Sequence, residues 1–295
     1  MNRLYFAALL MALSAFSATI MAQTALELPR KSPLASVAFQ IGFTEVGIRY
    51  SSPAARGRSL WGNLVPYDQV WRAGANEATL ISFSEPVQVE GRPLAAGRYA
   101  FFVIPRAAGL WTAIFNADTS QWGAYAYDES ADVMRIDIAV DTLCSPEERL
   151  HYYLSDTGLG EGQLCLRWDR RQICLDITTP FIERVQEQLL AVTSPLPPAE
   201  RWRPYAEAAD YLSSSDAHLS WALYYATEST ARFDHSWNWW IRAQIEARMG
   251  DFAAAVISAN RAVAAGLKDA TDNFFQSNQQ TIRTKINDWS GRAGR

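Results

Sequence analysis

Short runs of alternating apolar and polar residues dominate the chain from about Ser36 to Thr179. The runs are separated by Gly, Pro, Asp and Ser, and no stretch of useful length repeats with a helical period. This pattern disfavours a parallel sheet with crossover helices and predicts an antiparallel, jelly-roll-like β-sandwich over residues 32–180. The predicted strands are TEVGIRYS, TLISFS, PVQVEG, GRYAFFVIP, LWTAIFNA, VMRIDIAV and ERLHYYLS.

The stretch GQLCLRWDRRQICLDI predicts a tight hairpin with Asp169 and Arg170 as its two-residue turn. That register places Cys165 opposite Cys174, at a non-hydrogen-bonded pair where side chains approach most closely. In an oxidising compartment these two cysteines would form a cross-strand disulfide; otherwise they would pack as small apolar thiols. We expect the third cysteine, Cys144, to be buried and inert.

After Pro180 the apolar residues take a helical spacing. FIERVQEQLLAV predicts a helix that the prolines of SPLPPAE end, so residues 181–198 should link the sandwich to a helical domain, residues 199–295. The predicted fold class is therefore α+β with two domains. Two helical stripes are expected in the second domain, one formed by Trp237, Ile241, Ile245 and Met249 and the next by Phe252, Val256, Ala259 and Val263.

Gly250 and Asp251, between these stripes, combine a helix C-cap with an N-cap, as in a tight helical hairpin. With the small residues Ala255, Ala259 and Ala262, this spacing resembles a tetratricopeptide repeat. AERWRPYAEAADYLSSS and DAHLSWALYYATEST resemble a degenerate first copy. The helices would then either present a peptide-binding groove or simply cover the sandwich.

Residues 1–22 have the pattern of a signal peptide, because Arg3 precedes an apolar stretch and small residues surround Ala22. Cleavage after Ala22 would make the protein exported, either periplasmic or secreted; an uncleaved membrane anchor is the alternative. After cleavage we expect no membrane span. The net charge of −4, without a basic stripe, argues against nucleic acid as a partner.

WRAGANEAT, residues 71–79, can be interpreted as a corner between two strands. Gly74 permits a positive φ and Asn76 tolerates one. Arg72 and Glu77 could pair across the corner. Further candidates for the same polar cluster are Arg58 and Asp68.

The same loop also has the groups of a ligand site. Arg72, Asn76 and Glu77 can bind a carboxylate, a sugar or a peptide end, and Trp71 can offer a stacking face. The enzymatic alternative is a carbohydrate- or peptide-directed hydrolase, with Glu77 as acid or base and Arg72 as the orienting group. Glu77 exposed on the wall of an open cleft would favour the hydrolase, whereas Glu77 sealed beneath Trp71 would exclude it.

Other catalytic signals are weak. Glu77 has no partner acid at short spacing, and the three histidines, His151, His218 and His235, belong to no motif. No nucleophile elbow, phosphate loop or dinucleotide fingerprint occurs, so we expect neither a cofactor nor a metal.

A second stretch, IFNADTSQWGAYAYDESADVMR, carries Trp122, Tyr125 and Tyr127, which could form an aromatic platform for a sugar. Its acidic residues could hold calcium, although their spacing matches no defined binding loop: Asp118, Asp128, Glu129 and Asp132. Alternatively, the aromatic residues pack on the sandwich and the acids cap turns. The ligand-site candidates are thus Arg58, Trp71, Arg72, Asn76, Glu77, Thr79, Trp122 and Tyr127.

Several unusual motifs occur in one order: a GR…WG segment, VWRAGANEAT, AGRYAFFVIP and QWGAYAYD. Over roughly Ser32 to Thr179 the chain therefore resembles the domain-of-unknown-function family 2911, exported bacterial proteins common in the Bacteroidetes lineage. The resemblance implies an exported β domain, sometimes followed by helical repeats, and brings no catalytic residues. In SSPAARGR, Ser52 and Ala55 stand where an Arg-Pro and a Lys are expected, so a ligand-binding charge there would be missing. The family motif maps onto Arg56, Arg58, Trp71, Arg72, Gly74, Asn76, Glu77 and Thr79.

Together these patterns predict a non-enzymatic binding or scaffolding module of the bacterial cell envelope. Its ligand would be a protein or a glycan. The hydrolase that uses Glu77 and Arg72 is the alternative.

Overall fold

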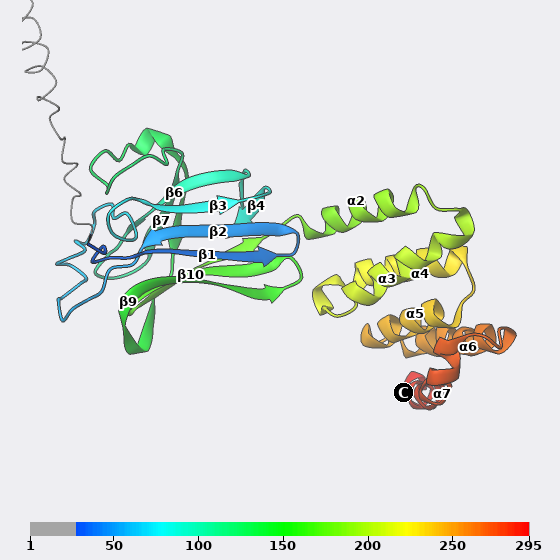
Figure 1. Cartoon of the computed structure of the whole chain (residues 1–295). Coiled ribbons are helices and arrows are strands. Elements are labelled where there is room, and N and C mark those ends of the chain that lie inside the picture. Colours follow the sequence, from blue (N-terminus) through cyan, green and yellow to red (C-terminus); the bar gives the residue numbers. More distant parts are fainter. Residues whose placement is uncertain (1–27, 295) are drawn as a thin grey trace, which may run out of the picture.

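The structure, a computed structural model, describes residues 28–294, so the predicted signal peptide, residues 1–22, lies outside the described range. Figure 1 shows a region of β-sheet followed by a region of helices. The predicted α+β fold class is confirmed. Within residues 28–294, no helix has both the length and the apolar character that crossing a membrane requires.

Two antiparallel sheets form the first region. The larger has the strand order β1-β2-β3-β6-β7-β8 and the smaller β5-β4-β10-β9. The larger sheet pairs neighbours along the chain, interrupted only where the β4–β5 hairpin belongs to the smaller sheet. The strands are β1 (Leu34–Ile41), β2 (Thr44–Ser51), β3 (Thr79–Phe83), β4 (Val87–Val89), β5 (Arg92–Leu94), β6 (Gly97–Ile104), β7 (Trp111–Asn116), β8 (Asp132–Ile138), β9 (Asp141–Gly158) and β10 (Glu161–Thr178).

Apolar side chains of both sheets form one core. The alternation along β2 is the clearest example, since every second residue is buried. Trp61 is partly buried and packs against three tryptophans of this core, Trp71, Trp111 and Trp168, with ring centroids 4.7 to 6.1 Å apart. We call these four residues the tryptophan cluster. Because Trp71 opens WRAGANEAT, this motif is fixed directly to the core.

The chain reverses direction within β10. Cys165 and Cys174 form a disulfide with their Cα atoms 4.1 Å apart, although nine residues of straight strand would span about 30 Å. Gln163 Nε2 donates a hydrogen bond to Asp176 Oδ1 at 2.8 Å in the same register. The two-residue turn therefore begins at Asp169, whose φ is +51°, as the sequence predicts.

The prediction for Cys144 was wrong, because its side chain is exposed. Most residues from Asp141 to Arg149 of β9 are exposed as well. This half of β9 extends past the core, so no apolar layer covers it. The prediction for Cys144 relied on the usual burial of cysteine, and residue type alone did not determine burial at this position.

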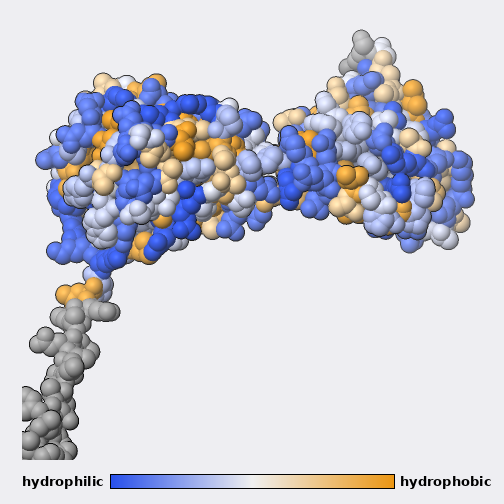
Figure 2. All heavy atoms as spheres, turned by 90° about the horizontal axis from the view of Figure 1, so that it is seen from above, coloured by the Kyte–Doolittle hydropathy of each residue, from blue (hydrophilic) through white to orange (hydrophobic). Residues whose placement is uncertain are grey.

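Phe181 joins the two regions. It is the first residue of α2, and its ring stacks on Phe43 at 5.7 Å and on His218 at 5.8 Å. The ring fits because Gly160 has no side chain: a Cβ there would lie 2.3 Å from the Cβ of Phe181. Across the same joint, His218 Nε2 lies 3.0 Å from the carbonyl oxygen of Leu159. Figure 2 shows the narrow connection between the two bodies.

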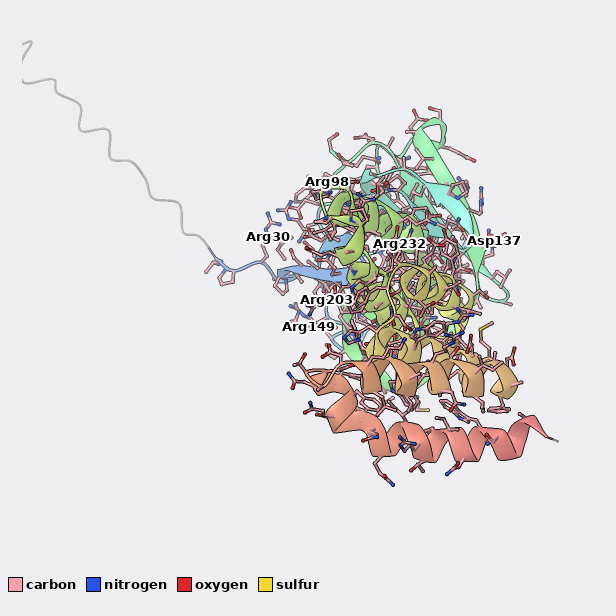
Figure 3. The ribbon with its side chains drawn as sticks, turned by 90° about the vertical axis from the view of Figure 1, so that its right-hand side faces the viewer. Arg30, Arg98, Asp137, Arg149, Arg203 and Arg232 are labelled. Atoms are coloured by element: carbon pink, nitrogen blue, oxygen red, sulfur yellow. A yellow bond between two sulfur atoms is a disulfide. The ribbon has the colours of Figure 1, made fainter. Side chains whose placement is uncertain are left out.

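Six α-helices form the second region. α3 packs on α4, α5 on α6 and α6 on α7, while α3 also contacts α5 and α5 contacts α7; α6 and α7 lie side by side in Figure 3. The α-helices are α2 (Phe181–Thr193), α3 (Trp202–Leu212), α4 (Leu219–Arg232), α5 (Ser236–Arg248), α6 (Phe252–Lys268) and α7 (Asn273–Ala293). Short 3-10 turns are η1 (Glu129–Ala131), η2 (Pro198–Glu200) and η3 (Asp216–His218).

The predicted junction between α5 and α6 is present. Gly250 has a φ of +87°, and Asp251 Oδ1 accepts a hydrogen bond from the backbone amide of Ala254 at 2.9 Å. Ala259 is fully buried, as the predicted stripe requires. Met249 is instead exposed, because it is the C-cap residue and lies past the last turn that packs.

Candidate functional site

The motif corner, residues 71–79, turns the chain from the tryptophan cluster into β3. Two of its residues have a positive φ, Ala73 at +50° and Asn76 at +59°. The expectation was right for Asn76, but Ala73 rather than Gly74 is the second such residue. Gly74 is needed for close packing instead, because a Cβ there would lie 2.9 Å from Thr79 Oγ1 and 3.2 Å from the carbonyl oxygen of Ser51.

Buried hydrogen bonds hold the corner in this conformation. The carbonyl oxygen of Ala73 accepts hydrogen bonds from Thr79 Oγ1 at 3.0 Å and from the Tyr152 hydroxyl at 2.8 Å. Trp71 Nε1 donates to the carbonyl oxygen of Gly74 at 3.2 Å. Since Thr79 is completely buried, this candidate ligand residue has a structural role.

Glu77 pairs with a residue that the sequence analysis did not consider. Its Oε1 lies 2.7 Å from Arg30 Nη1, and its Oε2 accepts from Ser51 Oγ at 3.3 Å. Among the described residues Arg72 forms no ion pair with Glu77, so the predicted pair is wrong. Asn76 Nδ2 donates to the same Ser51 Oγ at 3.2 Å. These polar groups therefore fasten the segment that precedes β1.

The environment keeps the Glu77 carboxylate ionised. Burial by itself raises the pKa of this carboxyl, but hydrogen bonds from its own backbone amide, Arg30 and Ser51 outweigh burial and hold the pKa below its ordinary value. A carboxylate with a lowered pKa is a poor proton donor near neutral pH.

Arg72 lies in a different environment. Its Nε is buried and has no hydrogen-bond partner among residues 28–294. Burial lowers the pKa of the guanidinium, an effect that Tyr125 partly opposes. A buried N–H without a partner is rare in folded proteins and calls for an explanation, such as a bound water or ligand.

Arg72 lines a cavity of about 190 Å³ that we call the arginine pocket. Two of the predicted candidates, Arg58 and Trp71, lie in its wall as well. Trp168 forms another part of the wall, and its ring stacks on Trp71 with the centroids 6.0 Å apart. The full lining is Ser32, Pro53, Arg58, Leu64, Val65, Trp71, Arg72, Gly74, Ala75 and Trp168.

Backbone carbonyls hold Arg58 in place. Its Nε donates to the carbonyl oxygen of Ala55 at 2.9 Å and its Nη2 to that of Ala54 at 2.7 Å. Asp68 does not belong to this cluster, contrary to the expectation, since it is exposed and absent from the pocket wall. Arg58 and Arg72 therefore both line the pocket, and none of its described lining residues is an Asp or a Glu.

The second aromatic motif lies beside the motif corner. Glu77 and Trp122 form an antiparallel bridge, and the amide of Gly123 donates to the carbonyl oxygen of Asn76 at 3.0 Å. Trp122 is 58% exposed and Tyr125 is 88% exposed. Two of the three predicted platform residues are thus at the surface next to WRAGANEAT.

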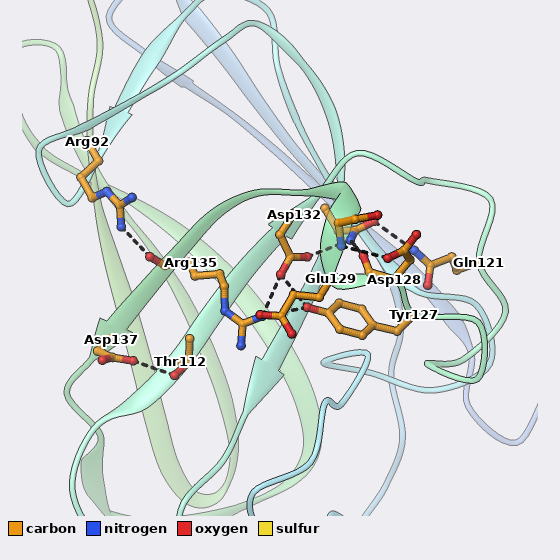
Figure 4. Close-up of polar contacts among 11 residues, drawn as sticks. Arg92, Thr112, Gln121, Tyr127, Asp128, Glu129, Asp132, Arg135 and Asp137 are labelled. Carbon is orange, nitrogen blue, oxygen red and sulfur yellow. Dashed lines mark hydrogen bonds and ion pairs between the residues drawn. The ribbon is translucent and has the colours of Figure 1, made fainter.

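Tyr127 does not join this platform. Figure 4 shows its hydroxyl pointing to Asp132, to which it donates at 2.5 Å, and Arg135 Nη1 donates to the same carboxylate oxygen at 2.9 Å. Burial and this carboxylate raise the pKa of the Tyr127 hydroxyl. Asn116 Nδ2 donates to the other carboxylate oxygen of Asp132 at 2.8 Å, so Tyr127 serves to fix the loop before β8.

The acidic residues of this loop bond within it. Asp118 accepts from the amide of Ser120, and Asp128 accepts from that of Ser130. In the described part of the chain, no group of three or more His, Cys, Asp or Glu side chains is placed to hold a metal ion.

The geometry around Glu77 differs from both outcomes considered for a hydrolase. The Glu77 side chain is 39% exposed, so Trp71 does not seal it. Glu77 nevertheless lies outside the wall of the arginine pocket. Its nearest charged partner is a cation, whereas a glycosidase needs a second carboxylate.

Comparison with protein families gives one match, to the family described as "Protein of unknown function (DUF2911)". Residues 32–177 belong to the DUF2911 family. This range covers both sheets and includes the motif corner, the arginine pocket and the second aromatic motif. No curated protein and no solved structure matches the chain.

Sequence reasoning missed several residues of the candidate site. Trp168, in the pocket wall, and Tyr152, on the Ala73 carbonyl, come from the strands of the smaller sheet. Arg30 comes from the segment before β1. Only the alternation of apolar residues around Tyr152 and Trp168 signalled that these two side chains face the core.

Proposed function

We propose that this protein is a non-enzymatic binding module of the bacterial cell envelope, with its ligand held in the arginine pocket. The supporting observation is Arg72, a residue that lines the cavity and whose buried Nε lacks a partner among the described residues. A bound ligand would relieve this cost. Arg58 and Trp71, selected from the sequence for other reasons, line the same cavity.

Export is part of the proposal. The pattern of residues 1–22 supports a signal peptide, and the bond between Cys165 and Cys174 fits an oxidising compartment such as the periplasm. The motifs quoted for the family support an origin in the Bacteroidetes lineage.

The helical region would serve as the scaffold. Its helices contact in a repeating pattern, α3 with α4 and α5, then α5 with α6 and α7, as expected for a tetratricopeptide-like array. Fully buried alanines on α6 support the close approach that such a repeat needs. We propose that this region docks a second component of the envelope while the β region binds its ligand.

Native mass spectrometry tests the binding function. The mature full chain would be incubated with a small-molecule extract of the cell envelope, desalted and compared with the Arg72→Met and Arg98→Met variants. Arg98 is the matched control, because it is an exposed arginine of the same domain (Figure 3). We expect a small-molecule adduct on the wild type and on Arg98→Met, and none on Arg72→Met. An unmodified wild-type mass, or an adduct that persists in Arg72→Met, would contradict the proposal.

A further inference from the structure

The charges around the arginine pocket define the ligand that it can accept. Arg58 and Arg72 both line it, and no described residue of its wall is acidic. Glu77, the acidic residue of the motif corner, is paired with Arg30, with Oε1 and Nη1 2.7 Å apart. Two positive charges beside a partly buried cavity without a counter-ion favour an anionic ligand.

The two guanidinium groups suit an oxyanion. Arg58 is already oriented, because two backbone carbonyls hold its Nε and Nη2, while its Nη1 bonds to no described residue. No hydrogen bond from the Arg72 guanidinium to a described residue is found, and its Nε is buried. Planar guanidinium groups with free N–H donors bind carboxylate and phosphate oxygens in a fork geometry.

The remaining walls select a carboxylate over a phosphate. Leu64 and Val65 form one part of the lining, and Trp71 and Trp168 form another. A dianionic phosphate next to such walls would pay a larger desolvation cost than a carboxylate monoanion. Phosphate sites commonly use the amides of a helix N-terminus, whereas the residues lining this pocket belong to loops and strands.

We propose that the arginine pocket binds a small organic carboxylate whose apolar or aromatic part packs against Trp71 and Trp168. This inference rests on the proposed binding function and names its ligand class. The carboxylate accepts hydrogen bonds from Arg58 and Arg72, and a cavity of about 190 Å³ limits the remainder to a small group. An isolated amino-acid-like acid and the carboxyl end of a peptide share this chemistry.

Isothermal titration calorimetry on the mature full chain tests the ligand class with three probes. Phenylacetate supplies a carboxylate and a ring, phenylacetamide is its neutral isostere, and inorganic phosphate is an anion without an apolar part. We expect saturable binding of phenylacetate, with phenylacetamide about 10- to 100-fold weaker because the charge-assisted hydrogen bonds are lost. We expect no measurable binding of phosphate.

Arginine variants test whether phenylacetate binds in the arginine pocket. Arg72→Met and Arg58→Met should each weaken phenylacetate binding about 10- to 100-fold, and Arg98→Met should leave it unchanged. Circular dichroism would check the fold of each variant; Arg58→Met supplies the answer if Arg72→Met misfolds, because Arg58 is exposed and fixed only to backbone carbonyls.

Three outcomes would overturn the inference: equal affinity for the amide, tighter binding of phosphate, or no effect of either pocket variant. The two proposals fail separately. A neutral adduct in the mass-spectrometric experiment, lost in Arg72→Met, would leave the binding function intact and refute the carboxylate.

The N-acetylated dipeptide of alanine and phenylalanine, with its carboxylate free, distinguishes the two sources of the carboxylate, an isolated acid and a peptide end. Tighter binding than phenylacetate identifies a peptide end, and weaker binding identifies an isolated acid.

Discussion

Replacing Arg72 by Met should make the ligand-free protein more stable. In most proteins, the loss of a partly buried arginine is destabilising, because its charge is paired. Arg72 forms no ion pair with a described residue, and its buried Nε has no hydrogen-bond partner there. Met keeps an unbranched apolar chain of similar reach against the same walls and removes the polar head.

The size of the expected stability change follows from the polar group that the substitution Arg72→Met removes. A buried donor without a partner costs about 1–3 kcal/mol. Part of this gain is offset, because the interaction of Arg72 with Tyr125 and some packing of the guanidinium are lost. We therefore expect a net gain of about 1 kcal/mol, which raises the Tm of a domain of this size by about 2–4 °C.

Differential scanning calorimetry of the mature full chain would measure this change, with Arg98→Met as the control expected to stay within about 0.5 kcal/mol of the wild type. Asn76→Ala should lower the Tm, because Asn76 Nδ2 bonds to Ser51 Oγ inside the motif corner. If Arg72→Met instead lowers the free energy of unfolding by more than about 1 kcal/mol, the predicted gain in stability is refuted. Arg72 would then be a structural part of the corner.

Four further changes test individual contacts. Thr79→Val removes one of two hydrogen bonds to the carbonyl that anchors the corner and should cost about 1 kcal/mol in urea unfolding; an unchanged midpoint would contradict this. Gly160→Ala, at a φ of +77°, should cost about 1–3 kcal/mol and expose the joint before α2 to limited proteolysis; wild-type resistance would refute the tight joint. Replacing both Cys165 and Cys174 by Ala should cost about 2–3 kcal/mol, since the bond closes a short loop, and an unaltered Tm would count against it. Glu77→Gln should destabilise slightly at pH 7, by less than about 1 kcal/mol for so exposed a pair. Because the folded pKa of Glu77 is lowered, its contribution is complete above the ordinary glutamate pKa and disappears as the pH falls through the folded value; an equal difference at pH 3 and pH 7 would contradict the pairing.

Features set by neighbouring residues could be predicted from the sequence. The alternation of apolar residues gave the antiparallel sheets, and the register of one hairpin placed Cys165 opposite Cys174. The Gly250-Asp251 junction was also predicted, because both helix caps depend on a few adjacent residues. The first strand, β1, was missed, since its half-buried alternation gives a weaker pattern than that of β2.

Features that depend on distant partners could not be predicted. Glu77 pairs with Arg30, which lies 47 residues earlier in the sequence, and not with the nearby Arg72. Ala73 has a positive φ, and the buried side chains of Thr79 and Tyr152 hold its carbonyl by hydrogen bonds. The conformational preference of glycine had favoured Gly74 for this backbone conformation. Tertiary contacts decided each of these cases.

The proposed ligand class also rests on the structure. Arg58, Trp71 and Arg72 were candidates because of their types, but the sequence did not separate them from Thr79, which is buried, or Tyr127, which holds a loop. Only the shared cavity, with Trp168 in its wall, distinguishes the first three residues.

A crystal structure of the mature chain with phenylacetate would test the central claim most directly. We expect density for the ligand in the arginine pocket, with carboxylate oxygens about 3 Å from guanidinium nitrogens of Arg58 and Arg72 and the ring against Trp71. Water alone in the pocket, with phenylacetate absent or bound elsewhere, would contradict it.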